Sequence, residues 1–150
     1  MQHQRKIVDD YVSAFVTLTP DNADDLYDLV ANDVFFSDPF NVSHHKDGFR
    51  QIFDHMFETC KNPRFSVSDV AHSDTASYLR WRMTGTLKSW PHTNLRFEGM
   101  TEVHVNPQGL ICQHIDHWDS ASQLMLVLPI MRLIIKPMLK LFQVKLAQKN

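Results

Sequence analysis

Apolar positions follow a helical spacing in the first 60 residues and a strict alternation afterwards. The helical part predicts three helices, over 2–18, 23–31 and 46–60, with Thr19-Pro20 separating the first two. One short strand is predicted between the second and third helices, over 34–37. The order of elements places helices early in the chain and strands late.

Alternation of apolar and polar residues begins after Asn62-Pro63. It predicts four strands, over 63–72, 76–87, 94–105 and 110–119. The turn signals between them are SDT, SWPHTN and NPQG. We therefore predict an α+β fold in which three N-terminal helices pack on one curved antiparallel sheet.

The last segment, 120–150, differs in kind from the first 119 residues, and we predict a helical extension there that follows a single domain over 1–119. It is very apolar but interrupted by Pro129 and Pro137. Its longest uncharged apolar run, 124–131, has eight residues, whereas crossing a bilayer takes about 20.

Charge divides the chain at the same place. Residues 1–119 hold 10 basic and 17 acidic residues, a net charge of −7, while 120–150 hold five basic residues and no acidic one. An acidic body is unsuited to gripping phosphate backbones, so we predict no nucleic-acid partner.

Arg132, Lys136 and Lys140 recur every fourth residue in the extension, between apolar residues. This pattern predicts a basic amphipathic helix over 124–146. Two interpretations stay open. The helix covers its own domain or a dimer mate, or it binds a membrane surface or a partner protein.

Cys60 and Cys112 show no metal or redox spacing, and the N-terminus MQHQRKIVDD is polar. We expect reduced thiols and a cytoplasmic protein, peripheral at the inner face of the membrane if the extension binds lipid. Nucleophile elbows and phosphate-binding loops are missing from the sequence, and no cofactor is predicted.

Candidate chemistry gathers at two places. Asp38 lies in FFSDPFN, where it either bonds the local backbone of a turn or serves as a base among aromatic residues. His114 and Asp116 are two apart on a predicted strand, so their side chains share one face. A histidine with a carboxylate two residues away suits a base and its orienting partner, a polar pair that holds the strand in register, or an anchor for a ligand.

Nine histidines raise the question of a metal site. One residue of the His44-His45 pair would join His114 and Asp116 in a set of two histidines and one carboxylate. Adjacent histidines point apart on an extended chain, and we predict no metal.

The segments YVSAF, LYDLVANDVFFSDP, GFRQIF, YLRWRMTGTL and GLICQHIDHWD, in that order, resemble the nuclear transport factor 2-like superfamily, in its SnoaL-like and ketosteroid isomerase-like branches. The resemblance covers about 5–119. It implies a cone of curved sheet and helices around one pocket, and a homodimer formed through the outer face of the sheet. The cone serves isomerases, cyclases, hydrolases and plain binding modules.

The resemblance also implies roles for single residues. Asp38 lies where the isomerases keep their general base, and Tyr11 matches the tyrosine that donates to the developing oxyanion. Thr101 stands where they carry a protonated aspartic acid, which argues against the steroid isomerase reaction itself. Matching the NPQG turn to that of the family directs His114 and Asp116 inward.

The expected site is therefore a pocket for a small hydrophobic molecule. Its catalytic candidates are Asp38, Tyr11, His114 and Asp116. The expected lining is Phe15, Phe36, Phe53, Phe57, Trp81, Met83, Thr101, Val103 and Trp118. One hypothesis is a cofactor-free isomerase, cyclase or hydrolase acting on a carbonyl, polyketide-like or lipid-derived substrate. The other is a non-catalytic module that binds a ligand, a protein or a membrane.

Overall fold

The computed structural model describes residues 2–144 and has the predicted α+β architecture. The helices of the body are α1 (Gln2–Val16), α2 (Ala23–Tyr27) and α3 (Lys46–Thr59). The strands are β1 (Val30–Ser37), β2 (Val42–Ser43), β3 (Cys60–His72), β4 (Ser77–Leu87), β5 (Asn94–Val105) and β6 (Ile111–Trp118). Two further helices follow, η1 (Ala121–Met125), a π-helix, and α4 (Pro129–Lys140).

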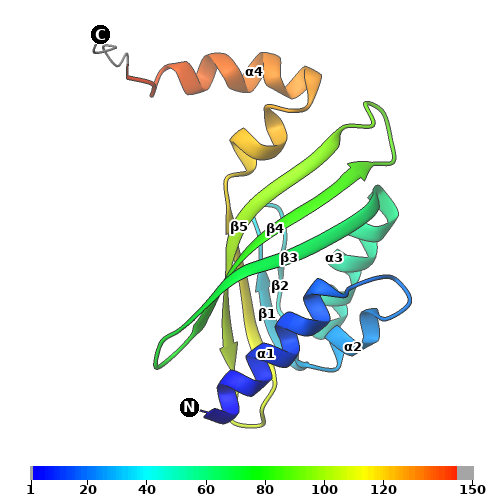
Figure 1. Cartoon of the computed structure of the whole chain (residues 1–150). Coiled ribbons are helices and arrows are strands. Elements are labelled where there is room, and N and C mark those ends of the chain that lie inside the picture. The colour runs from blue at the N-terminus through cyan, green and yellow to red at the C-terminus, as the bar shows by residue number, and fades with distance from the viewer. Residues whose placement is uncertain (1, 145–150) are drawn as a thin grey trace.

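One six-stranded sheet, in the order β2-β1-β6-β5-β4-β3, forms the wall of an open cone. The long strands β3 to β6 form an antiparallel meander, and β1 lies parallel to β6. Figure 1 shows the sheet curving around α1 and α3, which cover its inner face. The sheet does not close into a barrel, so the space between sheet and helices is open at one end.

The core lies where the apolar stripes of α1 and α3 meet the inner face of the sheet. Val8 and Tyr11 of α1 and Phe49 of α3 are completely buried there. Residues at i, i+3 and i+4 lie on one side of a helix, so this spacing turns a single apolar stripe of each helix toward the strands. Burial of these stripes fixes both helices on the cone.

Three predicted boundaries are wrong by three or four residues. The second helix ends at Tyr27 rather than at 31, and β1 begins at Val30 rather than at 34. Val30 pairs with Ile111 of β6, and this pairing takes Val30 and Ala31 into the sheet. Asn62-Pro63 does not precede a strand but interrupts β3, where the register with β4 shifts and Asn62 has a φ of 51°.

The C-terminal extension is not one continuous helix. A break at 126–128 separates η1 from α4, and Pro129 occupies the first turn of α4. α4 packs against η1, and Figure 1 shows it standing away from the end of the sheet. It therefore does not cover its own domain. The predicted range 124–146 extends two residues past the described part.

No helix within residues 2–144 combines the length and the apolar character needed to traverse a bilayer.

Candidate functional site

The strand register aligns the inward side chains of β4, β5 and β6 in rows. Thr101 stands directly opposite Asp116 on one side and Leu79 on the other. In the next row, Val103 stands opposite His114, which in turn neighbours Phe36 of β1. The inward direction expected for His114 and Asp116 is the observed one, and the register adds Thr101 to their neighbourhood.

His114 is a buried histidine enclosed by aromatic rings. Its side chain is 1% exposed. Its ring stacks between Phe15 and Phe36, at centroid distances of 5.6 and 5.0 Å. Phe15 comes from α1 and Phe36 from β1, so the imidazole is held from both sides and its two nitrogens are directed at fixed partners.

Tyr11, His114 and Asp116 form a chain of hydrogen bonds. The Tyr11 hydroxyl lies 2.8 Å from His114 Nδ1, and His114 Nε2 lies 3.1 Å from Asp116 Oδ1. Burial, followed by the nearby charge of Asp116, raises the pKa of Tyr11 well above its ordinary value, so the hydroxyl stays protonated. An ionised carboxylate only accepts, so the hydrogen of this bond is on Nε2, and Tyr11 donates to Nδ1 in the tautomer that carries this one ring hydrogen.

A second chain reaches the same carboxylate from β4. Trp81 Nε1 donates to Thr101 Oγ1 at 2.8 Å. The Thr101 hydroxyl then donates to Asp116 Oδ1 in a short hydrogen bond. An indole N–H can only donate, so the direction of this chain is fixed. Both chains end on Oδ1, and the hydrogen bonds within residues 2–144 leave Oδ2 without a partner.

Two hollows meet at Asp116. An enclosed apolar cavity of about 50 Å³ lies between α1, α3 and the sheet, and an open cleft of about 250 Å³ continues toward the wide end of the cone. Asp116, Trp81, Phe53 and Phe65 line both of them. The carboxylate is 18% exposed, whereas His114 and Tyr11 line neither hollow. Asp116 is thus the end of the Tyr11–His114–Asp116 chain that a ligand can touch.

Asp38 lies at the edge of the cleft and is held by its own turn. Its Oδ1 accepts hydrogen bonds from the backbone N–H groups of Phe40, at 2.7 Å, and Asn41, at 2.6 Å. The side-chain amide of Asn41 donates to the same carboxylate. These are the local bonds of a turn-forming aspartate. A role for Asp38 as base stays a prediction, whereas Asp116 has an oxygen free of such bonds.

Most of the expected lining residues do surround the two hollows. They are Phe15, Phe36, Phe53, Trp81, Met83, Thr101 and Trp118. Phe57 and Val103 do not. Phe57 lines a separate surface hollow with Leu18, and Val103 is completely buried within the sheet packing.

Sequence reasoning missed Phe65 of β3, Phe97 of β5 and Leu124 of η1, which also line the cleft. Phe97 stacks on Trp118 at a centroid distance of 4.7 Å. Strand alternation could have found Phe65 and Phe97. Both stand opposite Met83 on β4, which was expected to line the pocket. Nothing local points to Leu124, which reaches the cleft only through the path of the chain after β6.

Metal binding finds no support in side-chain grouping. Within residues 2–144, no three histidine, cysteine or carboxylate side chains gather as ligands. His44 instead contacts the ring of Phe35, at a centroid distance of 5.2 Å.

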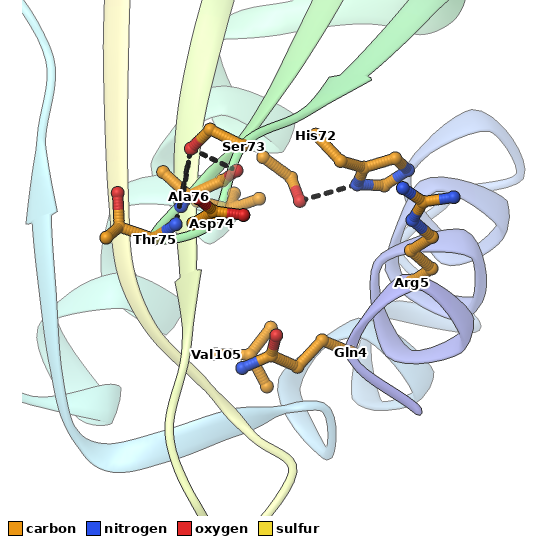
Figure 2. A pocket seen from close by; sticks show the side chains of 10 residues that line it. Gln4, Arg5, His72, Ser73, Asp74, Thr75, Ala76 and Val105 are labelled. Carbon is orange, nitrogen blue, oxygen red and sulfur yellow. Dashed lines mark hydrogen bonds between the residues drawn. The ribbon is translucent and has the colours of Figure 1, made fainter. Parts of the chain in front are cut away.

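Figure 2 shows a different hollow, where Gln4 and Arg5 of α1 face the turn between β3 and β4. Here His72 Nδ1 lies 2.8 Å from Ser77 Oγ. This hollow has a volume of about 30 Å³, which is too small for an organic ligand. Within residues 2–144, no third side chain hydrogen-bonds His72 to orient it, so the pair does not form a nucleophilic triad.

The fold and the enclosed pocket define the class of the protein, an α+β cone of the nuclear transport factor 2-like type. Residues 8–114 match the SnoaL-like domain, and the chain belongs to that family. No curated protein matches the chain.

Three solved structures illustrate how widely this cone is used. A nuclear transport factor 2-like protein of unknown function from Burkholderia pseudomallei K96243 has a TM-score of 0.70 and 15% identity, covering 85% of this chain and 98% of its own. A candidate polyketide cyclase from Xanthomonas campestris pv. campestris has a TM-score of 0.66 and 16% identity, with coverages of 81% and 93%.

The third is SalBIII, an epoxide hydrolase/cyclase-like enzyme of pyran ring formation in the polyether salinomycin, with a TM-score of 0.66, 13% identity and coverages of 79% and 92%. At these identities the likeness establishes the fold alone.

Proposed function

We propose that this SnoaL-like protein catalyses proton transfer, without a cofactor, on a hydrophobic carbonyl compound bound in the cleft, with Asp116 as the base. The observation that carries the proposal is the position of Asp116. Its carboxylate lines both hollows, and its Oδ1 is held by Thr101 and His114 while Oδ2 accepts no hydrogen bond from residues 2–144. A base must lie within hydrogen-bond reach of the proton it removes, and this carboxylate faces the open volume.

His114 and Tyr11 act in this proposal as positioning residues. Neither lines the cleft, and their hydrogen bonds hold the carboxylate in one orientation. Pre-positioning of the base lowers the cost of reaching a reactive geometry. A proton taken on Oδ2 leaves both hydrogen bonds to Oδ1 in place, so the network need not rearrange during the transfer.

Thr101 narrows the substrate class. It donates its hydroxyl hydrogen to Asp116, so it does not serve a developing oxyanion in the way that a protonated aspartic acid does. A suitable substrate therefore needs little hydrogen-bond donation to its developing oxyanion. This holds when two carbonyl groups already make its C–H proton acidic. A 3-oxoester or polyketide-like 1,3-dicarbonyl compound meets that condition, and its apolar chain fits the aromatic lining.

The test is exchange of the C2 proton of ethyl 2-hexyl-3-oxobutanoate with solvent deuterium, followed by NMR at a pD where the background exchange is slow. We expect catalysed exchange in the wild type and a fall of about 100-fold or more in Asp116→Asn, since a positioned base contributes about 10² to 10⁴ in rate. Glu102→Gln, on the outer face of the neighbouring strand, is the matched control. Equal exchange in Asp116→Asn and wild type would refute the assignment.

A binding module is the second candidate, and the lining of the cleft favours it. Most of the lining side chains are aromatic or aliphatic, as in a site that only holds an apolar ligand. Native mass spectrometry of the protein purified from its own cells separates the two. A retained apolar molecule, without catalysed exchange of the probe, would favour binding without catalysis.

A further inference from the structure

α4 exposes an unusually large apolar surface for a terminal helix. Four large apolar side chains of α4 are each more than half exposed, and so is Leu141 directly after its last residue. The four are Ile130, Leu133, Ile134 and Met138. Leu133 and Leu141 reach 77% and 82%. Contiguous exposure of this kind marks an interaction surface rather than scattered surface residues.

The cations of α4 lie together on the other side of the helix. At about 100° per residue, Arg132, Lys136 and Lys140 fall within an arc of about 80°, and the five exposed apolar residues occupy a separate arc of about 140°. The three cations also line one hollow of about 300 Å³ beside η1, together with Leu126, Leu139 and Gln143. One side of the helix is thus apolar, and the other offers a basic hollow large enough for an anionic headgroup.

We propose that α4 binds the surface of an anionic lipid bilayer, with its apolar arc among the acyl chains and its three cations at the level of the phosphate groups. A basic helix with a broad apolar face lies in the plane of such an interface. Charge complementarity supports the choice of an anionic surface, because residues 120–150 contain five basic residues and no acidic one.

Two features favour lipid over a second copy of the chain. The exposed apolar arc of about 140° is wider than the narrow seam that two packed helices share. In addition, α4 stands beyond the end of the sheet (Figure 1), which keeps the acidic body, at −7 over 1–119, away from a negatively charged surface.

Docking through α4 also places the cleft close to the lipid. Leu124 of η1 lines the cleft, and η1 packs directly against α4. Leu87 and Leu95 also line the cleft, and they lie on either side of the turn that joins β4 to β5. An apolar substrate dissolved in the bilayer would enter by this route. That consequence rests on the proposed function, whereas the membrane binding itself does not.

The experiment is flotation of the full chain with vesicles of phosphatidylcholine alone or with 30% phosphatidylglycerol, without any substrate. We expect binding to the anionic vesicles, weaker binding to the neutral ones, and a loss of affinity as salt rises. Arg132→Gln/Lys136→Gln/Lys140→Gln should bind on the order of 100-fold more weakly, because each cation near the surface contributes about fivefold.

Two further variants complete the design. Leu133→Gln/Leu141→Gln tests the apolar arc and should also lose binding. Lys61→Gln/Arg64→Gln/Arg80→Gln removes three exposed cations from the sheet, changes the net charge by the same amount, and should bind like the wild type. The main packing contact of α4 is with η1, so the body should keep its circular dichroism and its unfolding midpoint in every α4 variant.

Several outcomes would overturn the proposal. One is no flotation with anionic vesicles, and another is equal binding to both vesicle types. A third is an equal loss in the sheet control. If instead the apolar variant turns an oligomer into a monomer in analytical ultracentrifugation, and vesicles bind neither form, the α4 surface contacts a second copy and the lipid assignment is wrong. Failure of these tests leaves the role of Asp116 untouched, because exchange of the soluble probe needs no vesicle.

Discussion

Replacing Tyr11 with phenylalanine removes one oxygen atom and tests the buried network directly. The Tyr11 hydroxyl is the hydrogen-bond donor to Nδ1 of His114, at 2.8 Å, and both side chains are at most 1% exposed. Phenylalanine keeps the ring that packs edge-on against Phe15. The substitution therefore leaves a buried imidazole nitrogen without a partner while changing the apolar packing very little.

The expected cost follows from that unpaired nitrogen. A buried polar group that loses its partner costs about 1–3 kcal/mol, against about 1 kcal/mol for an ordinary exchange of hydrogen bonds with water. The site is apolar, with the imidazole stacked between Phe15 and Phe36, so water cannot easily replace the hydroxyl. We expect Tyr11→Phe to lower the free energy of unfolding by about 1–3 kcal/mol.

Urea unfolding followed by far-UV circular dichroism measures this change, and a double-mutant cycle with His114→Phe isolates the interaction. The double variant removes both polar partners, so it should be less destabilised than the sum of the single variants, with a coupling of about 0.5–3 kcal/mol. Tyr78→Phe is the matched control, since no hydrogen bond of its hydroxyl is found within residues 2–144, and it should stay within about 0.5 kcal/mol of the wild type.

The reasoning fails if Tyr11→Phe is as stable as the Tyr78→Phe control. It also fails if the two changes in the cycle are additive within about 0.3–0.5 kcal/mol. Either result would mean that the imidazole does not depend on Tyr11, and the positioning role given to Tyr11 would have to be withdrawn.

Two further predictions concern neighbouring features. A Cβ atom on Gly99 would lie 2.7 Å from the Trp81 ring and 2.8 Å from the Trp118 Cβ, so Gly99→Ala should destabilise the protein by about 1–3 kcal/mol in urea unfolding and shift its tryptophan fluorescence. Hydrogen bonds from Ser122 lower the pKa of Asp119, so the stabilisation of η1 is complete above the ordinary carboxyl value of about 4 and is lost as pH falls through the lower value of the folded state. The amide resonance of Ser122 should titrate with a midpoint below about 4, and Asp119→Asn should abolish that titration; a midpoint at or above 4 would contradict it.

Local patterns predicted the candidate site only up to a point. Alternation along β6 placed His114 and Asp116 on one face, because successive strand residues point to opposite sides. The same alternation placed Trp81 and Thr101 inward. It did not reveal that Thr101 stands opposite Asp116, since the register between β5 and β6 depends on residues far apart in the chain.

The balance between Asp38 and Asp116 was also beyond local reasoning. FFSDPFN allows either a turn or a base, and only the observed bonds from the backbone of Phe40 and Asn41 show the carboxylate engaged in its turn. The second helix was predicted four residues too long for a related reason. Val30 and Ala31 suit a helix or a strand, and pairing with β6 decided between them.

The sequence by itself determined the class of fold, the helix and strand faces, the charge division at residue 119 and the amphipathic character of the extension. These are properties of periodicity and composition, which neighbouring residues set through backbone geometry. Tertiary structure alone decided that Asp116 joins Thr101 and His114 while Asp38 bonds its own turn, that Tyr11 hydrogen-bonds His114 rather than lining the pocket, and that α4 stands clear of the body. Each of these depends on strand register and on packing between distant segments, which no local window of the chain contains.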